Sequence, residues 1–216
     1  KVGGILHNRD YPYEFLMDNL LIQNNLIKYS KHFNVKKFIF LGSSCIYPKH
    51  SKQPIKEEYL LTDSLEETNQ WYAIAKITGV KLCEAIFLKE NKQYISVMPT
   101  NLYGINDNFD VASSHVLPAL IRKFHEAKQL NKQEVILWGT GKPFREFLFV
   151  DDLAQFIISI MEKNVKNSIY NLGSGHEVSI LELANIIKKI VGYNGDVIFD
   201  SSMPDGTPRK LLNSKR

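Results

Sequence analysis

The feature that most constrains this sequence is a regular alternation between short apolar runs and longer amphipathic segments. Residues 37–41 form an apolar run that ends at Gly42, and residues 94–98 form another that stops before Pro99. Runs of this kind are typical of strands buried on both faces of a parallel sheet. The residues between them, 69–91, have the length and composition of a helix. The pattern therefore predicts an α/β fold built on a doubly wound parallel sheet.

The rest of the chain continues this alternation. Apolar residues between positions 11 and 32 recur at spacings of mostly three and four, which favours an amphipathic helix. The polar stretch 43–69 is expected to be a long loop, Asp151-Asp152 are expected to cap a helix, and residues 1–6 look like the tail of a strand. Further predicted elements are helices at 114–129 and 180–191, the second closed by Gly192, and strands at 135–138, 146–150, 169–172 and 197–199.

The composition is that of an ordinary globular protein. Of 216 residues, 44% are hydrophobic and 23% are charged, and the 27 basic and 23 acidic residues form no block that would favour a nucleic-acid partner. No apolar run approaches the roughly 18–20 residues of a membrane span, and the amino end lacks a signal-peptide layout, so we expect a cytoplasmic protein. Cys45 and Cys83 are expected to be reduced, and no metal site is expected.

Chemistry is expected where the predicted strands end, because ligands of such sheets bind at the carboxyl ends of the strands. Residues 43–45 and 99–103 occupy these positions. Tyr72 and Lys76 stand four residues apart in a predicted helix, so that they share one face. A phenol with an ordinary pKa of about 10 exchanges protons near neutrality only if a cation and a hydrogen-bond donor stabilise its phenolate. We expect Lys76 to be that cation and Ser43 or Ser44 to be the donor.

The Tyr72–Lys76 pair alone does not decide between an active site and a solvated helix face. Three motifs taken together favour an active site, and they resemble the extended short-chain dehydrogenase/reductase family of nucleotide-sugar enzymes. These motifs are Gly42-Ser43-Ser44-Cys45-Ile46-Tyr47-Pro48, Tyr72-Ala73-Ile74-Ala75-Lys76 and Pro99-Thr100-Asn101-Leu102-Tyr103-Gly104. Further stretches of similarity lie at 1–4, 114–116, 138–139, 145–148 and 204–210, so the resemblance covers essentially the whole chain.

The resemblance implies a Rossmann-like fold and an activity on a GDP-sugar. The expected substrate is GDP-4-keto-6-deoxy-D-mannose, in which two carbons flanking the ketone are inverted before the ketone is reduced with NADPH. Tyr72 is the implied proton donor for the reduction, assisted by Ser43 and Lys76. Cys45 and His115 are the implied pair for the epimerisation. The alternative for Cys45 is a small buried hydrophobe, and its place directly after Ser43-Ser44 argues against this. Without the resemblance, His115 would be a solvent-facing histidine at a helix start.

The resemblance also implies which residues bind the two ligands. The residues expected to contact NADP(H) are Leu41, Gly42, Ser43, Ser44, Lys76, Pro99, Thr100, Asn101, Leu102 and His115. Those expected to contact the GDP-sugar are Lys123, Trp138, Arg145 and Asp205. Position 123 departs from the family, which usually has Arg there, and Lys loses the bidentate geometry of Arg. Apart from the resemblance, these four would be a helix Lys, a core Trp, a surface Arg and a turn Asp, and Thr100 and Asn101 would be turn formers.

The sequence lacks the strand, Gly-rich turn and helix that receive a dinucleotide pyrophosphate. We therefore expect a fragment that binds NADPH poorly and exposes an apolar sheet edge. The resemblance also implies that a carboxyl-terminal segment is missing. Residues 1–104 are predicted to be the remainder of the dinucleotide-binding domain. Residues 105–216 are predicted to be mainly the GDP-sugar region, with some segments returning to the sheet. By resemblance, the helices at 11–32 and 69–91 pair with a second subunit in a homodimer.

Two alternatives stay open at this point. One is another epimerase or dehydratase of the same superfamily that acts on a UDP- or dTDP-sugar, and the presence of both Cys45 and His115 argues against it. The other is a non-catalytic module that only binds a nucleotide or a protein. Candidates for all the catalytic roles argue against this second alternative.

Overall fold

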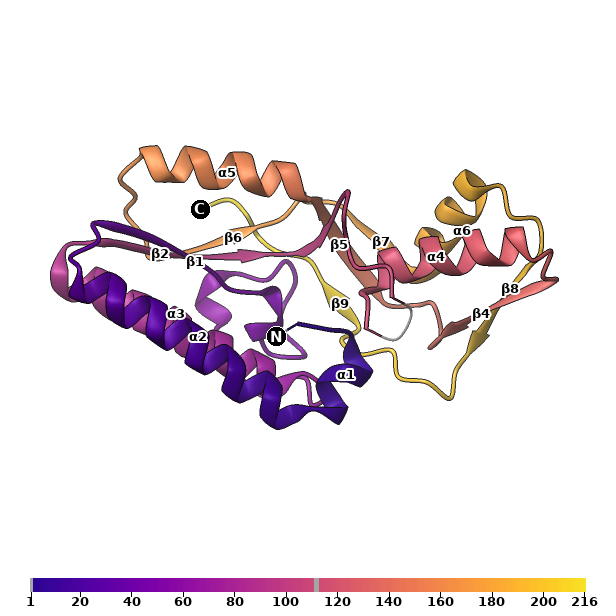
Figure 1. Ribbon diagram of the computed structural model, residues 1–216, viewed down its shortest axis with the longest axis horizontal. Helices are drawn as coiled ribbons and strands as arrows, with labels where there is room; N and C mark the ends of the chain where they lie inside the picture. Colours follow the sequence, from indigo (N-terminus) through magenta and orange to yellow (C-terminus); the bar gives the residue numbers. More distant parts are fainter. Residues whose placement is uncertain (1, 111–112) are drawn as a thin grey trace.

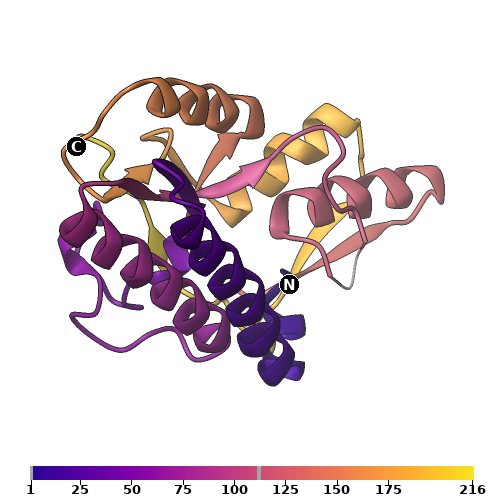
Figure 2. The ribbon, with the colours of Figure 1, turned by 60° about the vertical axis from the view of Figure 1, so that its left-hand side comes forward.

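The structure is a computed structural model that describes residues 2–110 and 113–216, and it has two lobes (Figure 1). The first lobe is built on three parallel strands, β1 (Lys37–Leu41), β2 (Gln93–Pro99) and β6 (Ile169–Leu172), in the order β1-β2-β6. Helices α2 (Pro12–His32) and α3 (Gln70–Glu90) cover one face of this sheet, and α5 (Val150–Glu162) covers the other. Figure 2 shows α2 and α3 side by side. The expected α/β fold with helices on both faces of a parallel sheet is confirmed.

Strand β2 shows why the sequence folds in this way. Tyr94 and Met98 belong to the core cluster under α3, whereas Ile95 and Val97 belong to the cluster under α5, and all four side chains are fully buried. Successive side chains of a strand point to opposite faces, so a strand between two helical layers must be apolar throughout. This is the reason for the continuous apolar run in the sequence.

The second lobe has its own core. Helices α4 (Val116–Gln129) and α6 (Ile180–Val191) pack beside a parallel pair of strands, β4 (Glu134–Trp138) and β8 (Asp196–Asp200). The buried residues of this core include Phe124, Leu137 and Ile187. Gly192 ends α6 with φ of 72°, as predicted from the sequence.

Short strands connect the two lobes. Strand β5 (Phe144–Phe149) pairs with β3 (Asn101–Tyr103), β7 (Glu177–Ser179) and β9 (Arg209–Lys210). Strands β3, β7 and β9 are two or three residues long and were not predicted, because such short segments carry no periodic pattern. Their pairing brings residues near 210 beside the end of the first-lobe sheet.

Several local expectations were wrong. Helix α5 begins after Phe149, so Phe149 and not an aspartate is its N-cap. Asp151 and Asp152 lie in the first turn, where their negative charges interact favourably with the positive end of the helix dipole. Residues near the amino end form helix α1 (Ile5–Asp10) rather than a strand, and Lys1 lies outside the described residues. The long loop after β1 contains two 3₁₀ turns, η1 (Ser44–Ile46) and η2 (Glu57–Tyr59).

Other features of the described residues bear on the function. None of their helices is long and apolar enough to cross a membrane. Across 2–110 and 113–216, no group of three or more His, Cys, Asp or Glu side chains could hold a metal ion.

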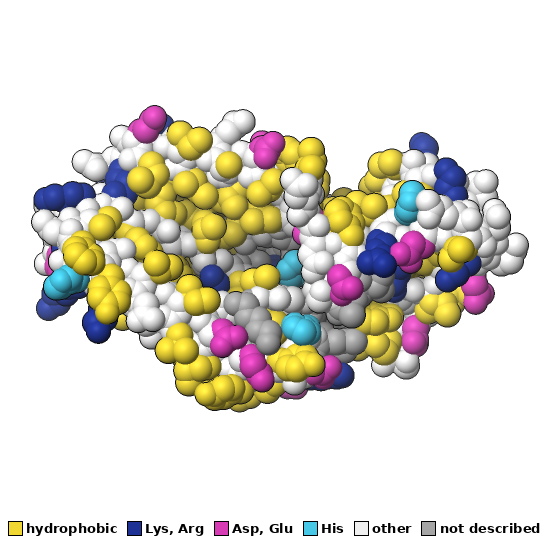
Figure 3. Space-filling model, in the orientation of Figure 1, with side chains coloured by type: hydrophobic (Ala, Val, Ile, Leu, Met, Phe, Trp, Pro, Cys, Tyr) yellow, Lys and Arg dark blue, Asp and Glu magenta, His cyan; other side chains and the backbone are white. Residues whose placement is uncertain are grey.

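Strand β1 is an outer strand of its sheet, and Leu41 at its end is 40% exposed. Figure 3 shows hydrophobic side chains gathered on the first lobe below α5. The division of the chain at residue 104 stays a prediction.

Candidate active site

Ser43 lies at the carboxyl end of β1 and joins two other candidate residues. Its extended backbone begins η1, and its hydroxyl accepts the backbone N–H of Cys45 at 3.2 Å. The same hydroxyl is hydrogen-bonded to the side chain of Tyr72, which projects from the first turn of α3. Ser44, in contrast, is buried. Of the two serines that the sequence offered, Ser43 is therefore the one that the structure brings to Tyr72.

The Tyr72 phenol is held in its protonated form. Burial raises its pKa, and negative charge on Cys45 raises it further, while the hydrogen bond with Ser43 lowers it. The Lys76 ammonium lies 5.7 Å from the centroid of the Tyr72 ring and donates to the carbonyl oxygen of Leu41 at 2.8 Å. The expectation that Lys76 makes the phenol acidic is thus wrong for this structure, because burial dominates. A protonated phenol beside a serine hydroxyl is suited to donating a proton.

Cys45 has the surroundings of a reactive thiol. Burial raises its pKa, but Lys210, the hydrogen bond with Ser43 and the charge of Arg145 together outweigh burial, so the pKa is lowered overall. The Lys210 ammonium donates to the Cys45 sulfur at 3.6 Å. Cys83 is different, because burial raises its pKa to about 12. The two cysteines therefore have different surroundings: Cys45 lies beside a cation, whereas Cys83 is packed in the core of the first lobe.

His115 lies just before α4, at the helix N-cap, and its side chain makes no capping hydrogen bond. The residue is exposed to solvent. Partial burial lowers its pKa, Asp107 opposes this, and Lys210 lowers the pKa further. The neutral imidazole is therefore favoured. Since Lys210 acts on both His115 and Cys45, the structure brings the predicted epimerisation pair to the same cation.

Lys210 was not among the predicted site residues. It lies in β9, only 9% exposed, where it pairs in register with Arg145 of β5. The sequence signal for it was present, because residues 204–210 were among the stretches of family similarity. A lysine in a two-residue strand gives no pattern of its own, so its position beside Cys45 could be found only from the tertiary structure.

Residues at the end of β2 are held in place by one carbonyl group. Thr100 Oγ1 and Asn101 Nδ2 both donate to the backbone oxygen of Glu146, at 2.9 and 2.8 Å. Asn101 begins β3, and Leu102 pairs with Leu148 of β5. Thr100 and Asn101 therefore tie β2 to β5, and the alternative of plain turn formers is wrong.

The predicted GDP-sugar residues form two groups. Arg145 donates to the backbone oxygen of Asp205 at 3.2 Å, and its charge acts on Cys45. The Asp205 carboxylate accepts the backbone N–H and the hydroxyl of Thr140, at 2.7 and 2.8 Å, which fixes the turn after β4. In the second group, Lys123 of α4 donates to the oxygen of Ile136 and lies 5.3 Å from the centroid of the Trp138 ring. This pair belongs to the second lobe, whereas Cys45 belongs to the first.

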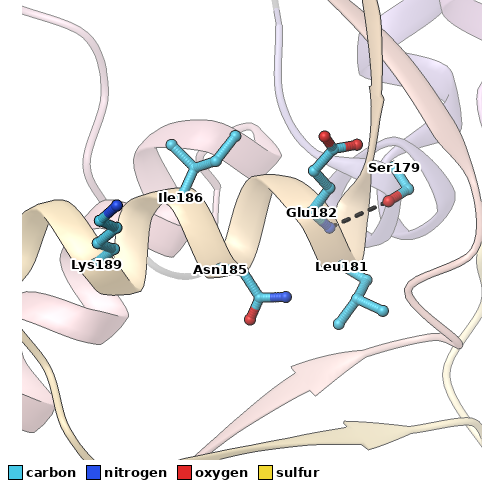
Figure 4. Close-up of a pocket in the computed structure, with 6 residues that line it drawn as sticks. All are labelled: Ser179, Leu181, Glu182, Asn185, Ile186 and Lys189. Atoms are coloured by element: carbon cyan, nitrogen blue, oxygen red, sulfur yellow. Dashed lines mark hydrogen bonds between the residues drawn. The ribbon is translucent and has the colours of Figure 1, made fainter.

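A shallow pocket of about 360 Å³ lies elsewhere, along one side of α6 (Figure 4). Its lining comes from that helix and from its N-cap Ser179, whose hydroxyl accepts the N–H of Glu182 at 3.1 Å. None of the predicted site residues lines it. The chemistry expected from the sequence therefore does not lie in this pocket.

The family model named "NAD dependent epimerase/dehydratase family" matches residues 1–173. The chain belongs to this family. Such a match agrees with the geometry above, in which the carboxyl ends of β1 and β2 carry the candidate residues.

Proteins with similar sequences include GDP-L-fucose synthases from plants and bacteria. GDP-L-fucose synthase 1 of Arabidopsis thaliana is 54% identical over 216 residues, which are 100% of this chain and 67% of that protein. GDP-L-fucose synthase of Escherichia coli (strain K12) is 51% identical, over 100% of this chain and 70% of that protein. The chain spans 66% of the length of two further plant relatives, which is just under two thirds. A crystal structure of a GDP-L-fucose synthetase from Naegleria fowleri bound to NADP is 33% identical, with a TM-score of 0.86 over 94% of this chain and 65% of that one.

Proposed function

We propose that this epimerase/dehydratase family member works in the synthesis of GDP-L-fucose. Its substrate is GDP-4-keto-6-deoxy-D-mannose, in which it inverts the two carbons flanking the ketone and then reduces the ketone with NADPH. The names of relatives at 51% and 54% identity support this reading. The observation that carries it is the Ser43 hydroxyl, which joins the Tyr72 phenol and the Cys45 backbone at one point. A proton donor for reduction and a thiol for epimerisation thus serve the same ketone.

In the epimerisation, Cys45 removes the proton from the carbon next to the ketone. The S–H bond forms as the C–H bond breaks, and the electron pair moves to the ketone oxygen, giving an enolate. The hydroxyls of Ser43 and Tyr72 donate hydrogen bonds to that oxygen and stabilise its charge. His115 serves the opposite face of the sugar, where its imidazolium form, charged with a proton from solvent, gives that proton to the carbon and returns to the neutral imidazole that its surroundings favour. Two groups are needed because inversion requires removal and return from different sides.

In the reduction, Tyr72 gives its proton to the oxygen of the former ketone. The raised pKa of Tyr72 keeps this proton in place until the oxygen becomes strongly basic. Ser43 holds the same oxygen and orients it toward Tyr72. Ser43 therefore positions the ketone in both steps.

The cofactor of the proposed reaction is NADP(H), which supplies a hydride when bound. The donor set of the described residues fits its nicotinamide ribose. The Lys76 ammonium is half-buried near Tyr72 and uses one N–H for Leu41, which leaves N–H groups that can donate to ribose hydroxyls. The remaining proposed contacts come from the ends of β1 and β2 and from His115. They are Leu41, Gly42, Ser43, Ser44, Pro99, Thr100, Asn101 and Leu102.

The GDP end of the substrate carries a diphosphate and a guanine. Arg145 and Lys123 supply positive charge for the phosphates, Trp138 an aromatic face for the base, and Asp205 a carboxylate. Burial lowers the pKa of Lys123, which marks its ammonium as partly desolvated. A desolvated cation gains more from an anionic ligand than a solvated one.

The assembly we propose is a cytoplasmic homodimer. Helix α2 carries Leu21, Ile22 and Leu26, which are 55%, 57% and 56% exposed. Neighbouring apolar side chains with this exposure are suited to packing against a second copy of the helix pair α2 and α3. Sedimentation of the purified protein would measure its oligomeric state, and a monomer at all concentrations would contradict the dimer.

The function is tested by incubating the purified protein with GDP-4-keto-6-deoxy-D-mannose in deuterated water, with and without NADPH. We expect deuterium to enter the two carbons flanking the ketone in both cases, and NADPH to be oxidised when it is supplied in large excess to offset the weak binding expected of this chain. The variant Cys45→Ser is the matched control, and it should lose deuterium incorporation. Absence of both deuterium incorporation and NADPH oxidation would contradict the proposal and favour another nucleotide-sugar epimerase of the family.

A further inference from the structure

The Lys210 side chain has an unusual setting for a lysine. It is 9% exposed, and burying an ammonium is costly unless an anion compensates. Among residues 2–110 and 113–216, no carboxylate lies within ion-pair distance of its nitrogen, which instead donates to the Cys45 sulfur at 3.6 Å. The group best able to compensate the Lys210 charge is therefore a thiolate at Cys45.

We propose that Lys210 is a positioning residue whose ammonium holds Cys45 as a thiolate, ready to act as a base. This inference rests on the proposed function, in which Cys45 removes the substrate proton. A thiolate, unlike a thiol, accepts a proton directly. Lys210 thereby sets the protonation state from which the epimerisation begins.

The charged and titratable groups around Cys45 agree with this role. Lys210 and Arg145 are the cations that act on the thiol, and the Ser43 hydroxyl is hydrogen-bonded to it. The neighbouring Tyr72 is neutral because its own pKa is raised. Lys210 also acts on His115, which is disfavoured as a cation, and the charge of Asp107 only partly offsets this. The surroundings of Cys45 are therefore positive overall, which favours the thiolate.

The backbone holds Lys210 at this point. Strand β9 pairs with β5, and Lys210 lies in register with Arg145. On either side of Lys210, the Gln53 side chain donates to the oxygen of Arg209 at 3.1 Å and accepts the N–H of Leu211 at 2.9 Å. A cation fixed in this way before substrate arrives needs little reorganisation during proton transfer.

The test is the pH dependence of Cys45 alkylation by iodoacetamide in the 216-residue chain, followed by mass spectrometry of the modified peptide. It compares the wild type with Lys210→Met, which keeps the length of the side chain but not its charge, and with Lys210→Arg, which keeps the charge. Cys83 is the internal control, since it is buried and its pKa is raised to about 12. The assay needs neither substrate nor cofactor.

We expect the wild-type rate to rise through an apparent pKa below that of an ordinary thiol, about 8.5. Lys210→Met should shift the profile upward by about one pH unit. Alkylation near neutrality should then slow about threefold, because the tenfold loss of thiolate is partly offset by its greater nucleophilicity. Lys210→Arg should restore most of the wild-type profile.

Two results would overturn the inference. One is a folded wild type in which Cys45 titrates at or above the ordinary thiol pKa, which needs no variant to be observed. The other is a Lys210→Met profile that matches the wild type. A low-pKa thiol in a protein that fails to exchange substrate protons would support the pairing of Lys210 with Cys45 and contradict the proposed function, so the two failures are distinguishable.

Discussion

The carboxylate of Glu146 accepts the backbone N–H of Gly175 at 2.6 Å, inside the layer of short strands that joins the two lobes. The Glu146 side chain is fully buried, and its other oxygen accepts the N–H of Leu212 at 3.0 Å. Gly173 leaves room for it, because a Cβ there would lie 2.6 Å from the Glu146 Cδ atom. One carboxylate thus fastens β5 to the turn after β6 and to the segment that follows β9.

We predict that Glu146→Ala lowers the free energy of unfolding by about 3–5 kcal/mol, because two buried N–H groups lose their acceptor and a cavity forms. Glu146→Gln keeps one acceptor oxygen and should cost about 1–2 kcal/mol. Urea denaturation would measure both values. A loss below about 1 kcal/mol for the alanine variant would contradict the bridging role.

Gly79 of α3 gives a second prediction, on stability. A Cβ at this position would lie 2.7 Å from Cε1 of Phe40 and 3.0 Å from Oε1 of Gln23. Alanine gains about 1 kcal/mol in helix propensity over glycine, but overpacking in a core costs about 1–3 kcal/mol. We expect Gly79→Ala to be less stable than the wild type by about 1 kcal/mol.

The neighbouring Thr78→Ala is the matched control for Gly79→Ala in thermal unfolding. Thr78 donates to the oxygen of Ile74 in its own helix, a contact that adds little stability. The control should therefore be neutral or slightly stabilised. Stabilisation by Gly79→Ala itself would show that Phe40 moves aside without cost.

Tyr72→Phe should separate the two halves of the proposed reaction. The ring keeps its edge contact with Phe15, so stability should change little, but the proton donor is lost. We expect NADPH oxidation with the keto-sugar to fall by about 10²–10⁴-fold, while deuterium incorporation falls far less because Ser43 still holds the ketone oxygen. Equal losses in the two assays would contradict the separate role of Tyr72.

The lowered pKa of Cys45 predicts a pH dependence of stability. An acid whose pKa is depressed by folding contributes stability that is present above its unfolded pKa and lost as the pH falls through its folded pKa. The pKa of Cys45 is lowered from 9.0, so this window lies below pH 9. The stability difference between the wild type and Cys45→Ser should therefore increase as the pH rises toward 9. Denaturation at several pH values would measure this, and a difference that is flat or falls with pH would contradict a lowered pKa.

The sequence predicted the elements whose identity is local. Strands β1 and β2 and helix α6 were found because an apolar pattern in each ends at Gly42, Pro99 or Gly192. Strand β9 was missed because two residues become a strand only through pairing with β5. The direction of the Tyr72 pKa was missed for a related reason, since burial depends on how helices pack and not on a four-residue spacing.

The contact between Lys210 and Cys45 spans 165 positions of the chain. During synthesis and early folding the thiol lacks this ammonium, so it behaves as an unremarkable cysteine with low affinity for electrophiles. The thiol gains its neighbouring ammonium only after β9 has been made and has docked, a late event for so non-local a pairing. A lowered pKa at this thiol therefore reports that β9 has docked, and before docking the chain is less exposed to oxidation or alkylation at Cys45.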